Sequence, residues 1–317
     1  MISMFMNFQW PRVDSITQPD SLKAIRQTIL EQIFLAKSGH PGGSLSLVEI
    51  LASIFDKNFE HTVTNPERPD RDRFILSKGH GVPALYSILS SLGFFAPEEL
   101  RNLRKFGHFL QGHPDKRRFS LMETSTGSLG QGASVGLGLA LGLRLAFSKG
   151  QISRLPRVYV VLGDGEMQEG QVWECLMAAG KFKPGNLIFI LDRNRGQIDG
   201  SVEEIMSLDP LEDKLKAFNL NVSTLDGHDV SALTRFFASL EVKSESRPTF
   251  VVANTLKGKG ISFMEHPTAW HGVAPKKIEL ERALWELFGG LPKEIPEGEP
   301  IPDCISPFGR LTLKGEV

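Results

Sequence analysis

A short apolar run that ends in a glycine-flanked aspartate most constrains how this chain folds. Residues 157–162 are rich in β-branched side chains and fit a buried strand. The run breaks at Gly163-Asp164-Gly165, a turn sequence that presents a carboxylate where the strand ends. Open α/β sheets bind their ligands at this carboxyl edge. We therefore expect a parallel sheet with a polar site after this strand.

A second strand of the same kind strengthens the prediction of a site. Residues 186–191 form another buried run after a helical stretch at 168–182, and Asn194 follows it thirty positions after Asp164. Consecutive strands of a parallel sheet often lie side by side, which would bring both side chains to one edge. Asp164 alone fits ordinary turn chemistry, but a carboxylate and an amide oxygen together suit Mg²⁺ or Ca²⁺. A cation held there would in turn hold a diphosphate.

The rest of the chain alternates in the same way. Helices are expected at 20–38, 129–147, 210–218, 230–240 and 278–288. Another helix is expected to begin near residue 46, and a further one, after a glycine-rich turn, to end by residue 93. Further strands are expected at 74–76, 220–225 and 249–254, and a polar loop at 61–72. Gly39 is a candidate cap for the first helix, and Ser46 with Glu49 has the capping-box pattern for the second. The fold class is thus α/β: a doubly wound, mostly parallel sheet with helices on both faces.

Composition restricts the partners and the compartment. The 317 residues carry a formal net charge of −1, which gives no reason to expect binding to nucleic acid or to an anionic membrane. The cysteines are Cys175 and Cys304 alone, which suits a reducing cytoplasm. The first ten residues are apolar but have no basic start and meet Pro11 too early for a signal peptide or a membrane span.

Two further patterns each have a structural and a functional interpretation. Segment 129–147 is nearly all apolar or glycine, with glycines at four-residue steps, which fits a membrane helix or a buried interface helix. Gln131, Ser134 and Arg144 favour the interface. Five of the eight histidines directly follow glycine: His40, His80, His108, His113 and His228. Each alone fits a structural loop residue, although an imidazole near a glycine can also bind phosphate or exchange protons.

Motifs along most of the chain resemble those of transketolases, from about residue 20 to residue 275. The glycine-flanked aspartate with Asn194 resembles the thiamine diphosphate motif, and Gly163-Asp-Gly-Glu-Met-Gln-Glu-Gly-Gln-Val-Trp-Glu174 resembles transketolase in particular. The other motifs, in family order, are Ser38-Gly-His-Pro-Gly42, Leu76-Ser-Lys-Gly-His80, Gly112-His-Pro114, Ser125-Thr-Gly-Ser-Leu-Gly-Gln-Gly132, Gln197-Ile-Asp-Gly200, Thr255-Leu-Lys-Gly-Lys-Gly260 and Trp270-His-Gly272.

The resemblance implies a thiamine diphosphate enzyme that transfers a two-carbon ketol unit between sugar phosphates. It assigns the cation to Asp164, the Asn194 side chain and the Gly196 carbonyl. It assigns cofactor contacts to His80, Gly127, Ser128, Leu129, Gly163, Asp164, Gly165, Glu169, Asn194, Ile198, Lys257 and His271. It assigns substrate hydroxyls and proton transfer to His40, His80, His113 and His271, and a link between paired cofactors to Glu169 and Glu174. His61, His108, His228 and His266 keep the structural interpretation.

The resemblance also implies a partner. Nothing in this chain matches the second half of a transketolase, which supplies the glutamate that activates the cofactor and basic residues that hold the sugar phosphate. We expect them on a separate C-terminal subunit with the pyrimidine-binding and C-terminal domains, in an assembly of two copies of each chain. The diphosphate-binding domain then spans 20–288, with an extension at 1–19 and a Pro/Gly-rich tail at 289–317.

Alternatives and one departure remain. Half of a 1-deoxyxylulose-5-phosphate synthase-like enzyme, a transketolase-like enzyme for a sulfosugar, and a non-catalytic scaffold homologue fit the same motifs. The chain has Arg195-Gly196 where family members commonly have Gly and an apolar residue, so we expect a less rigid metal carbonyl.

Overall fold

The computed structural model describes residues 15–60, 65, 67–265 and 269–289. Its centre is a sheet of five parallel strands in the order β1, β2, β3, β5, β4. The strands are β1 (Arg73–Leu76), β2 (Val158–Gly163), β3 (Leu187–Arg193), β4 (Asn221–Asp226) and β5 (Thr249–Asn254). This confirms the α/β class, and the neighbouring β2 and β3 bring Asp164 and Asn194 to one edge as predicted.

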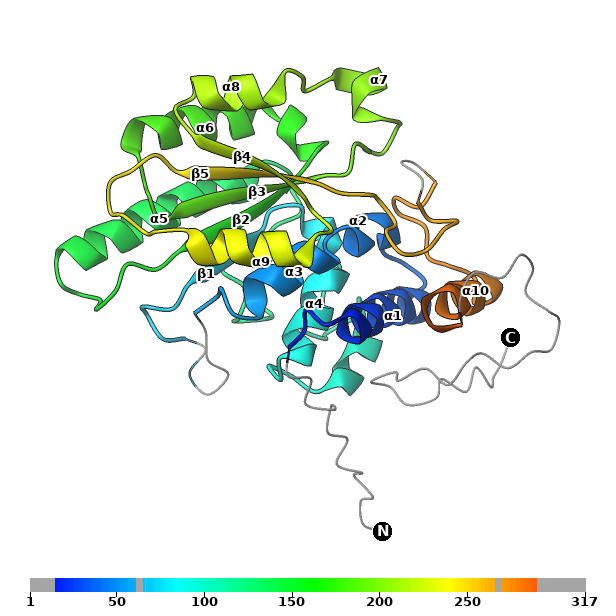
Figure 1. The fold of residues 1–317 in the computed structure, drawn as a ribbon. Helices are drawn as coiled ribbons and strands as arrows, with labels where there is room; N and C mark the ends of the chain where they lie inside the picture. Colours follow the sequence, from blue (N-terminus) through cyan, green and yellow to red (C-terminus); the bar gives the residue numbers. More distant parts are fainter. Residues whose placement is uncertain (1–14, 61–64, 66, 266–268, 290–317) are drawn as a thin grey trace, which may run out of the picture.

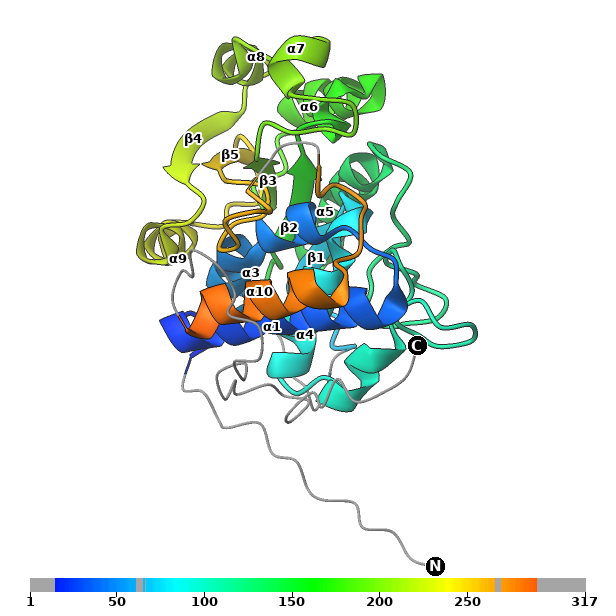
Figure 2. The same ribbon diagram turned by 90° about the vertical axis from the view of Figure 1, so that its right-hand side faces the viewer.

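Helices cover both faces of the sheet (Figures 1 and 2). One face carries α1 (Pro19–Ala36), α2 (Pro41–Leu45), α3 (Val48–Phe55), α4 (Val82–Ser91), α9 (Val230–Ser239) and α10 (Lys277–Phe288). The other carries α5 (Gln131–Ser148), α6 (Gly170–Phe182) and α8 (Leu211–Ala217). Short pieces complete the described chain: η1 (Gly79–Gly81), η2 (Pro97–Asn102), η3 (Glu166–Gln168) and α7 (Val202–Met206).

The central strands contribute to both hydrophobic cores, because successive side chains point to opposite faces. In β2, Tyr159 and Val161 join the core under α1, α3 and α9, whereas Val158, Val160 and Leu162 join the core under α5 and α6. All five are fully buried. The central strands are therefore held from both sides, which makes their carboxyl ends a firm platform for a site.

Helix α5 lies close to the sheet because two of its glycines face the strands. A Cβ at Gly132 would lie 2.4 Å from Ser77 Oγ, and one at Gly136 would lie 2.3 Å from Val160 Cγ2. Gly138 and Gly142 have nothing within 4 Å of such a Cβ. The two pairs of glycines thus lie on different faces of α5, and only Gly138 and Gly142 are exposed. No helix in the described part of the chain, α5 included, is long and apolar enough to cross a membrane.

Two predicted helix ends are wrong. Helix α1 ends with Lys37 in the left-handed conformation, at φ 52°, and its N–H donates to the carbonyl of Phe34, so Gly39 is not the cap. The expected capping box at Ser46 and Glu49 is absent as well. Ser46 Oγ instead donates to Asp192 Oδ2 at 2.6 Å, and Glu49 binds Arg26 at 2.6 Å. Both side chains thus bond to residues distant in sequence and not to the helix end.

The other expected helices and strands agree with the observed positions to within about three residues. Helices α2 and α7 and the short 3-10 pieces η1, η2 and η3 were not predicted. Helix α7 begins at a Ser201 cap, whose hydroxyl accepts the N–H of Glu204 at 3.2 Å. Residues 1–14, His61, His266 and the tail from residue 290, with Cys304, lie outside the described residues. Within the described part, packing already begins at Ile16, which is buried.

Candidate cofactor and substrate site

The carboxyl edge of the sheet holds a cavity of about 360 Å³. Side chains reach it from the ends of the central strands and from the loops that follow. Its lining contains His40, Gly43, Lys78, His80, His113, Gly127, Leu129, Gly163, Asp164, Gly165, Glu166, Gln168, Glu169, Asn194, Gly196, Gln197, Ile198, Lys257 and His271. The structure therefore brings together the four singled-out histidines and all three predicted metal-binding residues.

A buried ion pair forms the floor of this region. Lys78 Nζ lies 2.5 Å from Asp192 Oδ2, and the two side chains are 1% and 0% exposed. Asp192 also accepts hydrogen bonds from Ser46 and Thr255, and Lys78 donates to the carbonyl of Gly43 at 3.2 Å. Burial acts to raise the pKa of Asp192, but Lys78 and these donors hold it below its usual value. No sequence pattern indicates this pair, because its partners lie 114 residues apart.

Asp164 lies at the end of β2 and is buried rather than exposed at the rim, with only 2% of its surface accessible. Its carboxylate accepts the backbone N–H of Arg195, a residue in the left-handed conformation at φ 60°. Burial raises the pKa of Asp164 to about 7, and the charge of Asp192 adds to this rise. An anionic Asp164 therefore lacks a full counter-charge, as expected of a carboxylate that takes a cation.

Asn194 and Gly196 complete the oxygen-rich side of the cavity. Asn194 Nδ2 donates to Asp192 Oδ2 at 3.3 Å, so its amide oxygen is on the side away from that carboxylate and accepts the Gly196 N–H at 3.1 Å. Gly196 also pairs with Ser201 in an isolated bridge, which ties the loop back on itself. Carboxylate, amide and carbonyl oxygens suit a hard cation. Among the described residues no cluster of three or more His, Cys, Asp or Glu side chains offers an alternative metal site.

Three histidine rings pack together above the floor. The ring centroids of His40, His80 and His271 lie 5.3 to 5.5 Å from one another, and His113 lies 6.2 Å from His40. Burial lowers the pKa of His40 to about 4 and that of His271 to about 3. It lowers the pKa of His80 and His113 as well. The cluster is therefore uncharged at neutral pH, and each ring offers one donor and one acceptor.

Two features of this cluster point to a bound molecule. The Nδ1 of His40 is buried and has no hydrogen-bond partner among the described residues. Lys257 Nζ lies 2.9 Å from His271 Nδ1, and burial, followed by repulsion from Lys78, lowers the pKa of Lys257 to about 8. Lys257 is thus mostly charged at neutral pH yet has no carboxylate in ion-pair contact in the described chain. It is a cation available to an anionic group in the cavity.

The loop that carries Lys257 is held by a network that local sequence patterns do not reveal. Glu49 forms an ion pair with Arg26 at 2.6 Å and contacts His228 Nδ1 at 3.0 Å. The side chains of Arg26 and Glu49 are buried, and that of His228 is half-buried. His228 Nε2 accepts the backbone N–H of Leu256 at 2.8 Å, and Arg26 Nε donates to the carbonyl of Lys259 at 2.9 Å. His228 is structural, as expected, but it anchors the site loop.

Glu166 anchors a second loop of the site. Its buried carboxylate accepts the N–H of Gly130 at 2.9 Å and that of Gly163 at 3.2 Å, and it accepts the hydroxyl of Ser77. Burial raises the pKa of Glu166 despite these donors.

Gly127, at φ 128°, packs so closely on the His113 ring that a Cβ would lie 2.9 Å from it. Glycine is therefore required there.

The remaining predicted residues lie at or beyond the mouth of the cavity. Gly163, Gly165, Leu129 and Glu169 line it, and Ile198 does so with 66% of its surface exposed. Ser128 is exposed and does not line the cavity, and neither does Glu174, which is exposed on α6. Glu99 binds His108 at 2.7 Å, which keeps that histidine structural.

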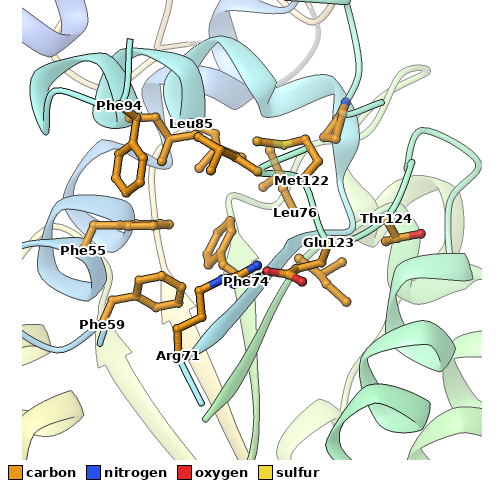
Figure 3. A pocket seen from close by; sticks show the side chains of 14 residues that line it. Phe55, Phe59, Arg71, Phe74, Leu76, Leu85, Phe94, Met122, Glu123 and Thr124 are labelled. Carbon is orange, nitrogen blue, oxygen red and sulfur yellow. Dashed lines mark hydrogen bonds and ion pairs between the residues drawn. The ribbon is translucent and has the colours of Figure 1, made fainter. Parts of the chain in front are cut away.

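A second, smaller cavity of about 40 Å³ lies beside β1. In Figure 3 the rings of Phe55, Phe59 and Phe74 face Leu85 and Met122, with Arg71 and Glu123 at the side. Arg71 and Glu123 form an ion pair with each other. With an apolar lining and its charges paired, this cavity is a packing feature.

Comparison with known proteins agrees with this geometry. The family model described as transketolase, thiamine diphosphate binding domain, matches residues 17–295. The 6-deoxy-6-sulfo-D-fructose transketolase subunit SqwG of Clostridium sp. (strain MSTE9) is 40% identical over 83% of this chain and 91% of that protein. One of the apulose-4-phosphate transketolase subunits, from Phocaeicola vulgatus, is 37% identical over 83% of this chain and 90% of that protein.

Whole transketolases match over only part of their length. Human transketolase is 36% identical over 90% of this chain but only 45% of that protein. The crystal structure of Pichia stipitis transketolase in complex with sedoheptulose 7-phosphate has a TM-score of 0.79 and 30% identity, and the match covers 89% of this chain and 42% of that one. The chain belongs to the transketolase family of transferases, of which it forms the thiamine diphosphate binding domain.

Proposed function

We propose that this chain is the N-terminal subunit of a two-chain transketolase that transfers a two-carbon ketol unit between sugar phosphates. The observation that carries the proposal is the cavity in which cation-binding oxygens, four uncharged histidines and Lys257, a lysine without a carboxylate partner in the described chain, meet. A non-catalytic scaffold has no use for buried, imperfectly paired charges, which cost stability.

The residues present fit thiamine diphosphate with Mg²⁺ or Ca²⁺. Asp164, the Asn194 amide oxygen and the Gly196 carbonyl would hold the cation, and Lys257 would contact the diphosphate. Gly127 and Leu129 would border the aminopyrimidine half, and Ile198 would cover the exposed side. When bound, the cofactor supplies a carbanion that adds to a ketose carbonyl.

The histidines act on the sugar. Because His40, His80, His113 and His271 are neutral at pH 7, each can donate one hydrogen bond and accept another from substrate hydroxyls. A donor that faces an oxygen as it becomes negative stabilises the transition state. The buried and unpaired Nδ1 of His40 is the clearest such position.

A partner chain completes the site. Three relatives of similar length are named as subunits, whereas this chain covers less than half of human transketolase. We infer a separate subunit with the pyrimidine-binding and C-terminal domains, in a cytoplasmic assembly of two copies of each chain. Glu169, exposed at the mouth of the cavity, lies where a second copy could reach it.

The decisive experiment mixes this chain with its candidate partner. Ketol transfer from xylulose 5-phosphate to ribose 5-phosphate is expected only with both chains, thiamine diphosphate and a divalent cation. Pyruvate with glyceraldehyde 3-phosphate is offered in parallel and should give no product. Transfer by this chain alone would contradict the two-subunit proposal. Absence of cofactor binding by calorimetry in the complete mixture would favour the scaffold alternative.

A further inference from the structure

Arg104 lies beside the histidine cluster, in the loop between η2 and His113. Its backbone is in the left-handed conformation at φ 62°, and its N–H donates to the carbonyl of Leu110 at 2.8 Å. A non-glycine residue in this conformation costs stability and is found preferentially at functional sites.

The guanidinium of Arg104 packs on the backbone next to His113. A Cβ at Gly112 would lie 2.5 Å from Arg104 Cζ and 2.7 Å from Nε, so the guanidinium lies directly against this glycine and a larger residue would push it aside. The positive charge of Arg104 contributes to the lowered pKa of both His40 and His113, which places it close to those rings. Arg104 is therefore a neighbour of the site, although it lies outside the cavity lining.

This charge is not neutralised by the described chain. No carboxylate among residues 15–60, 65, 67–265 and 269–289 forms an ion pair with Arg104, and its side chain has no hydrogen-bond acceptor there. Burial lowers the pKa of Arg104, and no neighbouring anion opposes that effect. The side chain is half-buried, so its five donors are partly removed from water without replacement.

The contacts give the site a direction. Lys257 contacts His271, His271 contacts His40 and His80, and His40 contacts His113. Arg104 lies against Gly112, the residue before His113. A molecule that lies along the histidines thus has one cation at the cofactor end and another at the far end. A sugar that carries an anionic group on its last carbon complements the second of these cations in charge.

We propose that Arg104 binds the anionic group, phosphate or sulfonate, at the far end of the sugar substrate and so determines specificity from within this chain. The inference rests on the proposed function. The resemblance to transketolases implies that basic residues of the partner hold this group; Arg104 adds one from the present chain. Its planar guanidinium can form two parallel hydrogen bonds to either oxyanion.

The test uses the reconstituted two-chain enzyme and three ketoses that differ only at carbon 6: fructose 6-phosphate, 6-deoxy-6-sulfofructose and fructose. Arg104→Gln should raise KM about 10- to 100-fold for the anionic donors, the range for a lost charge-assisted hydrogen bond, and change kcat little. Its kcat/KM for fructose should stay within about twofold of wild type. Comparison of the two anionic donors shows which oxyanion the site takes.

Two further variants separate binding from folding. Arg104→Lys keeps the charge but lacks the two parallel N–H donors of a guanidinium, and should retain part of the discrimination between anionic and neutral donors. Lys105→Gln removes the neighbouring exposed lysine, whose side chain bonds only to Asn102 in the described chain, and should behave as wild type for all three donors. All variants are compared with wild type for thermal midpoint.

Several results would overturn the inference. An equal loss for fructose and fructose 6-phosphate means that Arg104 has a structural role, and no change with any donor means that it binds nothing in the reaction. A wild-type enzyme that uses all three donors equally recognises no anion. A wild-type mixture without any ketol transfer contradicts the proposed function itself, and the inference fails with it.

Discussion

Lys78 Nζ lies 2.5 Å from Asp192 Oδ2 beneath the site, and water reaches neither group. Two opposite charges removed from water stabilise each other only as a pair, and the loss of one leaves the other unpaired. Lys78→Met should therefore lower the free energy of unfolding by about 3–5 kcal/mol.

Urea denaturation of the isolated chain measures this effect. The double variant Lys78→Met/Asp192→Asn should recover part of the loss, because no buried charge remains. Lys23→Met, an exposed lysine on α1, is the control and should change stability by less than about 0.5 kcal/mol. If the single and double variants are equally destabilised, the ion pair is not the cause.

Asp164 predicts a pH-dependent cation affinity. Its pKa is raised to about 7, so protons compete with the cation below that pH. Affinity for Mg²⁺ with thiamine diphosphate should rise about tenfold per pH unit below pH 7 and level off above it. Asp164→Asn should abolish this dependence and most of the binding, which calorimetry with the partner present would measure.

The same residue makes a prediction for the apo chain. Between pH 3.8 and about 7 the folded chain binds the Asp164 proton more tightly than the unfolded chain does, so stability falls as the pH rises through this window. Asp164→Asn should reduce this fall and leave the apo chain folded. Asp199→Asn, in an exposed loop position nearby, should leave the profile unchanged. A variant that is unfolded at pH 8 would contradict the expectation.

His113 and His271 should matter for turnover more than for stability. Both are only partly buried, and neither belongs to a hydrophobic core. His113→Ala and His271→Ala should each lower kcat about 100- to 1,000-fold, the usual effect of removing a donor to developing charge. His108→Ala, which loses the bonds to Glu99 and to the Leu110 N–H and the stacking on Phe109, all outside the cavity, is the matched control. Reductions of tenfold or less in both would return these residues to a structural role.

His228 should act on cofactor affinity through the Lys257 loop. Because Nε2 accepts the Leu256 N–H, Nδ1 carries the proton that is donated to Glu49. His228→Ala loses both hydrogen bonds and should weaken thiamine diphosphate binding about tenfold. His228→Gln retains a donor and an acceptor and should restore most of it.

Hydrogen exchange at Leu256 distinguishes positioning from general destabilisation. The Leu256 amide should exchange faster in His228→Ala than in His228→Gln, while amides in β2 and β3 keep their protection. Faster exchange throughout the sheet would show that His228 supports the whole fold instead.

The sheet and its edge could be predicted well, because those features depend on local pattern. Alternating buried runs identify β2 and β3, and the glycines around Asp164 mark where a strand must end. The motif resemblance then placed the four histidines in one cavity, which no local pattern contains. Predictions were weaker where a side chain chooses between local and distant partners. Ser46 was predicted to cap a helix, yet it bonds Asp192, 146 residues away.

Burial was the other property that the sequence did not reveal. Asp164 reads as a turn carboxylate, but the loop at Arg195 folds over it, and burial raises its pKa. Lys78, Asp192 and Glu166 are charged residues within or beside recognised motifs, and only the packed structure shows that each neutralises or anchors another group. Ser128 was assigned a cofactor contact by motif alone, and the structure leaves it outside the cavity lining.

Helix α5 has a geometric consequence for whatever covers the sheet on that side. Gly132 and Gly136 let its backbone rest on β1 and β2, and Gly138 and Gly142 leave its outer backbone bare. On its outer side, at Gly138 and Gly142, no side chain of α5 covers the helix backbone. A neighbouring helix that packs there can come closer to the strand ends than ordinary helix diameters of about 10 Å allow. The distance at which a second helix would pack on this side is therefore set by the missing side chains of Gly138 and Gly142.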